Sequence, residues 1–311
     1  MRELVVISGK GGTGKTSLTA AFAALSKNSV LCDADVDAAD LHLLMAPSVI
    51  TRTDFKAGNE AIINPELCTR CGLCRELCRF DAVSEDFVID SIACEGCGVC
   101  VDFCPVTAID FPVKTCGEWY LSQTRFAPMV HARLGIAEEN SGRLVSLVRQ
   151  EARAYGESHG QDLILTDGPP GVGCPVIASL GGATAVCIVT EPTVSGLHDM
   201  ERVIRLAAHF NIPGMVIVNK YDLNPSMAAD IERLAQERNI RCLGRIPYDP
   251  VFTKAMIQGK TIIEYDEHSE LAEKVKAIWQ TIISSPVMNS QGIKDFKEMI
   301  KPLQGPALAK K

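Results

Sequence analysis

The sequence predicts an α/β protein whose doubly wound, mostly parallel sheet is interrupted by a small α+β insert. Short apolar runs alternate with helix-like segments along most of the chain, which is the pattern of a parallel sheet covered by helices. Between residues 62 and 112 this alternation stops and eight cysteines appear. We therefore expect a discontinuous α/β domain at 1–61 and 113–284, an insert at 62–112 and a tail at 285–311.

The first apolar run, residues 4–7, is followed closely by Gly-Lys-Gly-Gly-Thr-Gly-Lys-Thr at 9–16. This spacing fits a P-loop, in which glycines turn the backbone so that successive N–H groups point at a phosphate. In that pattern Lys15 reaches the β- and γ-phosphates, and Thr16 offers its hydroxyl to Mg²⁺. The predicted nucleotide-binding residues of this segment are Gly11, Gly12, Thr13, Gly14, Lys15, Thr16 and Ser17.

Lys10 adds a second lysine to the loop. The resulting Lys-Gly-Gly-x-Gly-Lys-Thr resembles the deviant Walker A motif of the MinD/ParA/Mrp family and of the nitrogenase iron protein. The resemblance implies a P-loop ATPase that binds ATP and Mg²⁺, with Lys10 and Lys15 as catalytic residues. It also implies a nucleotide-sandwich dimer in which Lys10 crosses to the partner's nucleotide, the partner being a second copy or a similar ATPase.

The ends of later apolar runs match further positions of this family. The resemblance implies that Asp35 orients the attacking water and that Asp167 binds Mg²⁺ through water. Asn219 and Pro247 correspond to the adenine-reading and base-flanking positions. Because Asn219 also begins the sequence Asn-Lys-Tyr-Asp, which fits the guanine-reading motif of GTPases, GTP stays open as a lesser alternative to ATP.

The insert contains two copies of one cysteine spacing, C-x₂-C-x₂-C-x₃-C. The spacing matches the bacterial two-cluster ferredoxin, where three close cysteines hold one 4Fe–4S cluster and the fourth reaches the other. Zinc sites instead use two pairs of ligands, so the triplets favour iron and sulfide. The predicted ligands are Cys68, Cys71, Cys74 and Cys104 for one cluster, and Cys78, Cys94, Cys97 and Cys100 for the other.

Three further residues have less specific interpretations. Cys116 is expected to be a buried packing residue, and His131 a structural histidine. Cys174 follows Asp167 at the offset of a cluster cysteine in the nitrogenase iron protein. Plain packing is the expected role of Cys174, and a third cluster that bridges two subunits stays open as an alternative.

Composition narrows the classes of function. Thirteen cysteines in a chain without an export signal favour metal ligands over disulfides, and we expect a cytoplasmic protein. The net charge of −7 argues against bulk nucleic-acid binding. Ile293, Phe296 and Ile300 have helical spacing in the tail, which leaves weak membrane attachment as an alternative to docking on the body or on a partner.

Two functions fit these observations. In the first, ATP binding and hydrolysis drive a dimer switch that gates electron transfer through two 4Fe–4S clusters to a redox partner protein. In the second, the protein is a regulatory ATPase in iron–sulfur or metal-cofactor assembly, or in MinD-like spatial positioning, with the clusters as sensors. A complete set of eight ligands in one module favours electron transfer.

Overall fold

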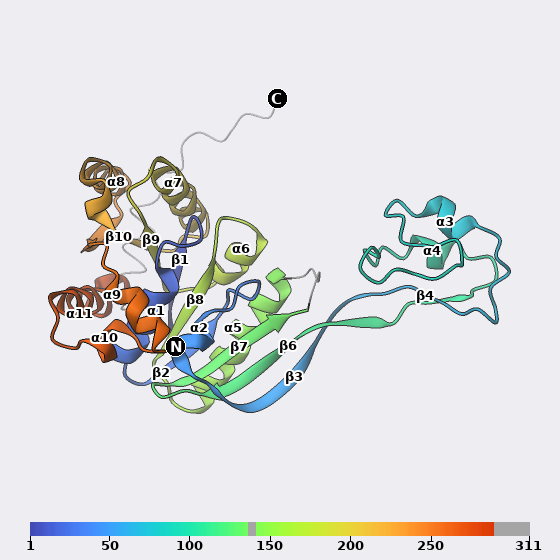
Figure 1. The fold of residues 1–311 in the computed structure, drawn as a ribbon, viewed down its shortest axis with the longest axis horizontal. Helices are drawn as coiled ribbons and strands as arrows, with labels where there is room; N and C mark the ends of the chain where they lie inside the picture. The colour runs from blue at the N-terminus through green and yellow to red at the C-terminus, as the bar shows by residue number, and fades with distance from the viewer. Residues whose placement is uncertain (136–140, 289–311) are drawn as a thin grey trace. The chain divides into compact units, whose positions relative to one another are not determined.

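The computed structural model describes residues 1–135 and 141–288 of the 311-residue chain. The chain divides into two compact units, whose elements are labelled in Figure 1. Of the described residues, unit 1 consists of 1–52, 120–132 and 141–288, and unit 2 consists of 53–119 and 133–135. The tail segment that contains Ile293, Phe296 and Ile300 lies outside the described residues.

The main sheet has the strand order β11-β10-β9-β1-β8-β2-β7-β6-β3. All neighbouring strands from β11 to β7 run parallel, which confirms the expected mostly parallel sheet. Its strands are β1 (Arg2–Ser8), β2 (Ser29–Asp33), β3 (Ser48–Asn59), β6 (Val113–Gln123), β7 (Pro128–Leu134), β8 (Leu163–Pro170), β9 (Ala185–Thr190), β10 (Gly214–Asn219) and β11 (Arg241–Ile246).

Helices cover both faces of this sheet, as a doubly wound fold requires (Figure 1). Strand β1 divides its apolar side chains by period two, so that Leu4 and Val6 face one core and Val5 and Ile7 face the other. The helices of unit 1 are α1 (Lys15–Leu25), α2 (Leu41–Met45), α5 (Ser141–Ser158), α6 (Cys174–Leu180), α7 (Val194–His209), α8 (Pro225–Glu237), α9 (Val251–Ile257), α10 (Ile262–Tyr265) and α11 (Glu270–Ile283).

Three local expectations differ from the structure. The segment 119–137, expected to turn from strand into loop, contributes the end of β6 and all of β7, joined by a turn that Thr124 Oγ1 closes by donating to Ala127 O at 2.7 Å. Strand β8 continues past Asp167 to Pro170, because Pro170 pairs with Ser8 of β1. The spacing of Leu144, Leu147 and Val148 predicts a helix that runs to about residue 153 and buries these three, whereas α5 runs to Ser158 and buries Val145 rather than Leu147.

Unit 2 repeats one local motif twice. Helices α3 (Leu73–Leu77) and α4 (Val99–Asp102) each begin at a glycine in the left-handed region, Gly72 with φ 84° and Gly98 with φ 77°. The short strands β4 (Ile62–Ile63) and β5 (Ile109–Asp110) pair antiparallel. The duplication read from the cysteine spacing therefore has a structural counterpart in the backbone.

In residues 1–135 and 141–288 no helix combines the length and the apolar character needed to cross a bilayer.

A buried ion cluster joins three elements of unit 1. Glu3 of β1 receives two hydrogen bonds from Arg149 of α5, at 2.8 and 2.7 Å, and one from Thr166 Oγ1 of β8, at 2.9 Å. Arg149 also donates to Ala178 O at 2.6 Å and to Gly181 O at 2.9 Å. These two hydrogen bonds attach the carboxyl end of α6 to the cluster. The cluster links β1 to β8, the two strands whose carboxyl ends carry residues of the candidate site.

We predict that Arg149→Met destabilises unit 1 by roughly 1–3 kcal/mol, because the buried Glu3 carboxylate loses its bidentate partner and keeps only Arg153, at 3.0 Å, as a cation. Urea denaturation followed by circular dichroism measures the shift of the midpoint. The matched control is Arg233→Met, which removes a side chain that pairs with Asp230 and Glu237 at the surface. Equal midpoint shifts in the two variants would contradict the prediction.

Candidate functional site

The P-loop connects β1 to α1 through two glycines with positive φ. Gly12 has φ 79°, and Gly14, the N-cap residue of α1, has φ 89°. A Cβ on Gly14 would lie 2.4 Å from Asn219 Nδ2, so the position excludes any side chain. Gly11 and Gly12 are exposed, whereas Thr13 and Lys15 are buried. The loop therefore exposes its backbone to solvent at Gly11 and Gly12, while Thr13 and Lys15 anchor it in the protein.

Lys15 occupies the centre of the site. Its Nζ lies 3.1 Å from Asp167 Oδ1 at the end of β8 and 3.3 Å from Asp35 Oδ2, just after β2. Burial alone lowers the pKa of Lys15, and the charges of Asp167, Asp35 and Asp33 more than reverse that effect, so the pKa is raised. Lys15 is thus a buried, fully charged cation held between carboxylates of two strands.

Hydroxyl groups of α1 bind the same carboxylate. Thr16 Oγ1 donates to Asp167 Oδ2 at 2.8 Å, and Thr19 Oγ1 donates to Asp167 Oδ1 at 2.9 Å. The structure therefore brings together Lys15, Thr16, Asp35 and Asp167. Thr19 was not foreseen from the sequence, although it follows Lys15 by one helical turn on the same face.

Asp33 belongs to the cluster of three carboxylates, Asp33, Asp35 and Asp37, that the sequence places at the end of the second strand, although the sequence gives Asp33 no specific role. It pairs in register with Asp167 on the neighbouring strand and accepts the Asp35 N–H at 3.2 Å. Within the described residues, its other oxygen, Oδ2, is buried without a hydrogen-bond partner. Burial and the charge of Asp167 raise the pKa of Asp33 well above its ordinary value. The site therefore contains more carboxylate than Lys15 alone neutralises.

Asn219 supports the P-loop from β10. Its Nδ2 donates to Thr13 O at 2.7 Å, and its Oδ1 accepts the Lys220 N–H at 3.0 Å. Lys220 Nζ donates to Gly12 O at 2.8 Å, so two adjacent residues bind two adjacent carbonyls of the loop. These contacts turn the carbonyls toward β10 and leave the N–H side of the loop for a ligand.

The other predicted residues lie around this centre. Pro247 directly follows β11, and the next residue, Tyr248, donates its N–H to Asp222 Oδ1 at 2.6 Å. Ser17 Oγ lies 3.3 Å from Met256 Sδ of α9. Lys10 Nζ lies 2.5 Å from Glu191 Oε1, at the end of β9. Glu191 was missed from the sequence, although Glu-Pro after an apolar run marks the same edge of the sheet.

In unit 2, the eight cysteines of the repeated motif line two separate cavities. One cavity is lined by Cys68, Cys71, Cys74 and Cys104, and the other by Cys78, Cys94, Cys97 and Cys100. Each cavity thus takes three cysteines from one copy of the motif and the fourth from the other. The remaining lining of both cavities is mainly apolar, with side chains such as Ile63, Ile109, Phe80 and Val83.

These cavities are not arranged around a single metal ion. Among residues 1–135 and 141–288, no three His, Cys, Asp or Glu side chains converge in a way that could hold one ion. Burial raises the pKa of the thiols of Cys74 and Cys100, so they keep their protons in this state. Any group that binds here as a thiolate complex must displace those protons.

The remaining candidates fall outside both sites. Cys116 is buried and its Sγ donates to Ala57 O at 2.8 Å, a packing role as expected. His131 bonds Ser122 Oγ through Nε2 at 2.9 Å, and burial lowers the pKa of His131 to about 4. Cys174 is exposed at the start of α6, so the packing role expected from the sequence is wrong.

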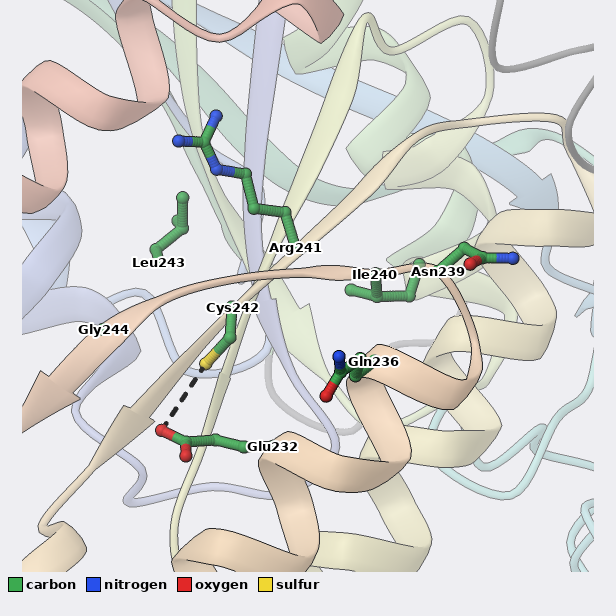
Figure 2. A pocket seen from close by; sticks show the side chains of 8 residues that line it. All are labelled: Glu232, Gln236, Asn239, Ile240, Arg241, Cys242, Leu243 and Gly244. Carbon is green, nitrogen blue, oxygen red and sulfur yellow. Dashed lines mark hydrogen bonds between the residues drawn. The ribbon is translucent and has the colours of Figure 1, made fainter.

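A further pocket lies along β11 and the end of α8, where Cys242 Sγ approaches Glu232 Oε1 at 3.9 Å (Figure 2). Its lining residues run from Glu232 to Gly244 and include none of the residues predicted to bind nucleotide or metal.

Comparison with known proteins identifies the class to which this fold and site belong. Residues 4–262 match the sequence profile of the CobQ/CobB/MinD/ParA nucleotide binding domain. The chain therefore belongs to this family. The protein MJ0578 of Methanocaldococcus jannaschii is 30% identical over 289 residues, which cover 90% of this chain and 96% of that protein.

Solved structures agree on the fold. The septum site-determining protein MinD of Pyrococcus horikoshii, in complex with Mg-ADP, superimposes with a TM-score of 0.56 at 18% identity. The superposition covers 91% of this chain and 96% of the MinD chain. The MinC:MinD cell division protein complex of Aquifex aeolicus gives a TM-score of 0.56 at 18% identity, covering 92% and 97%. This protein is an ATP-binding ATPase of the MinD/ParA type, which confirms the expected enzyme class.

We predict that Gly14→Ala weakens ATP binding at least about tenfold, equivalent to about 1.4 kcal/mol, because the added Cβ displaces Asn219 from Thr13 O and strains a positive φ. Calorimetric titration with Mg-ATP measures the change. Gly160→Ala is the control, since Gly160 also has positive φ but no atom lies within 4 Å of an added Cβ. Unchanged affinity in Gly14→Ala would contradict the packing argument.

Proposed function

We propose that this protein is an ATP-driven dimer switch that gates electron transfer through two 4Fe–4S clusters to a partner protein. The observation that carries the proposal is the pair of cavities in unit 2, each lined by four cysteines drawn from both copies of the motif. The same chain carries a P-loop site of the MinD/ParA type. The two sites together suit a protein that couples nucleotide state to redox chemistry.

Lys15 and Asp167 would exchange partners when nucleotide binds. In the described state Lys15 neutralises Asp167 and Asp35. Mg²⁺ prefers oxygen ligands, and Thr16 with Asp167 supplies them, directly or through water. A divalent ion there would take over the neutralisation of Asp167 and free Lys15 for the β- and γ-phosphates. Asp35, once released by Lys15, would orient the attacking water.

ATP is the proposed nucleotide, in preference to GTP. The base would lie near Asn219 and Pro247, at the carboxyl ends of β10 and β11. A GTPase reads guanine with the aspartate of Asn-Lys-x-Asp, here Asp222. One oxygen of Asp222 accepts the Tyr248 N–H at 2.6 Å, and both polar ends of Asn219 bind within the chain, so these contacts do not separate the two bases. The match to the MinD/ParA nucleotide binding domain is what supports ATP.

The cysteine sets fit 4Fe–4S clusters by their donor chemistry. Four thiolates per cluster is the usual ligand number, and such clusters supply reversible one-electron transfer when bound. Gly96 permits the chain to pass close to the second set, since a Cβ there would lie 2.2 Å from Asn59 O. The chain runs from Asp35 through α2 and β3 into this unit, which gives nucleotide state a covalent route to the cysteines.

The charge of unit 2 indicates the chemistry of its redox partner. Between residues 53 and 119 the sequence contains twelve carboxylate side chains and five Lys or Arg. The exposed apolar side chains of Phe80 and Val106 border the two cysteine cavities. A partner with a basic docking face would therefore associate fastest. Its association rate would fall at high salt, because salt screens the attraction.

We predict that the anaerobically purified protein contains about eight irons and eight sulfides per chain, as two four-iron clusters require. Cys71→Ser should lower the iron content to about four and leave ATP binding intact, because unit 1 holds the nucleotide residues. Cys116→Ser, which changes a buried thiol outside both cavities, is the control and should keep the full content. Four irons in the wild type, or zinc in their place, would refute the two-cluster assignment.

The gating function itself predicts reciprocal coupling between nucleotide and clusters. A coupling free energy of about 1.4 kcal/mol would make ATP shift a one-electron potential by about 60 mV and make cluster reduction shift ATP affinity about tenfold. Anaerobic redox titration with EPR detection, with and without Mg-ATP, measures both quantities. Asp35→Asn should bind ATP but respond weakly.

Unchanged potentials and unchanged affinity in the wild type would rule out thermodynamic gating. The alternative of a regulatory ATPase in cofactor assembly or spatial positioning would then be the better supported function.

A further inference from the structure

Lys10 makes three polar contacts with one segment of its own chain. A lysine ammonium has three N–H donors. Lys10 Nζ lies 2.5 Å from Glu191 Oε1, 3.4 Å from Thr193 Oγ1 and 3.4 Å from Ser195 Oγ. All three acceptors lie between the end of β9 and the first turn of α7. In this state the donors of Lys10 are therefore engaged within the chain rather than offered to a second subunit.

Glu191 divides its two oxygens between two lysines. While Oε1 binds Lys10, Oε2 lies 3.1 Å from Lys220 Nζ, and Lys220 also donates to Gly12 O at 2.8 Å. The side chain of Glu191 is 15% exposed. Burial raises the pKa of Glu191, but hydrogen bonds from Lys10 and Lys220 outweigh it and lower the pKa below its ordinary value. The carboxylate is thus charged at neutral pH.

We propose that Glu191 is a positioning residue that holds Lys10 on its own chain in the resting protein and releases it to the nucleotide of the second subunit. This inference rests on the sandwich dimer of the proposed function. A triphosphate carries more negative charge than one carboxylate and offers several acceptors to an ammonium group. Lys10 therefore leaves Glu191 only when such an anion is presented close by.

Lys220 makes this exchange reversible. A carboxylate buried without a cation is costly, so an isolated Lys10–Glu191 pair would resist opening. After Lys10 leaves, Glu191 still binds Lys220, and Lys220 still binds Gly12 O of the P-loop. No charge is left unpaired at either end of the exchange. Glu191 consequently sets the free energy of Lys10 release and with it the protein concentration at which ATP produces a dimer.

The resting contact is tested without nucleotide. We expect sulfo-N-hydroxysuccinimide acetate to acetylate Lys10 about threefold faster in Glu191→Gln than in the wild type, in line with the loss of a partly exposed ion pair. Peptide mass spectrometry gives the rate at Lys10. The matched control is Glu201→Gln on α7, where the carboxylate binds Arg205 and Arg238. An unchanged or slower rate in Glu191→Gln overturns the holding role.

Release is tested by sedimentation with Mg-ATP. Glu191→Gln should dimerise at about ninefold lower protein concentration than the wild type, because each dimer opens two Lys10–Glu191 pairs and each pair contributes about a threefold factor. Glu201→Gln should match the wild type. The double variant Lys10→Ala/Glu191→Gln should dimerise at the same concentration as Lys10→Ala alone, because Glu191→Gln affects dimerisation only through Lys10. Dimerisation of Glu191→Gln at the wild-type or a higher concentration overturns the release role. A wild type that stays monomeric with ATP overturns the sandwich dimer itself, and the acetylation rates still decide whether Glu191 holds Lys10.

Discussion

The nucleotide site depends on the charge balance between Lys15 and the carboxylates at the ends of β2 and β8. Asp33 and Asp167 are register partners on adjacent strands, and Asp35 follows two residues later. Carboxylates this close to one another would repel, and Lys15 at 3.1–3.3 Å from two of them offsets that repulsion in the resting state. The same arrangement makes a divalent cation a natural replacement for Lys15. The site is therefore organised for exchange of cations rather than for static pairing.

The P-loop keeps its shape because neighbouring strand ends hold it from the inner side. Asn219 and Lys220 bind consecutive carbonyls, at Thr13 and Gly12, and Glu191 binds Lys220. Gly14 is required because Asn219 leaves no room for a Cβ. The loop, β9 and β10 thus form one hydrogen-bonded assembly, so a change at the end of β9 reaches the backbone of the P-loop.

Unit 2 follows a different principle, in which local turns rather than a large core set the structure. Each copy of its motif starts a short helix from a left-handed glycine, and its apolar residues pack mainly around the cysteine cavities. A unit of this size buries little apolar surface on its own. Bound clusters would add the covalent connections that such a small core lacks.

The sequence by itself determined the features that depend on local spacing: the P-loop, the strand-end carboxylates Asp35 and Asp167, and the repeated cysteine motif. Glycine conformation, ligand spacing and apolar periodicity act over a few residues, so they can be read along the chain. Only the tertiary structure decided which distant residues meet, such as Glu191 with Lys10, Lys220 with Gly12, and Asp222 with the Tyr248 N–H. Those contacts depend on strand order and register, which place segments far apart in sequence at one edge of a sheet.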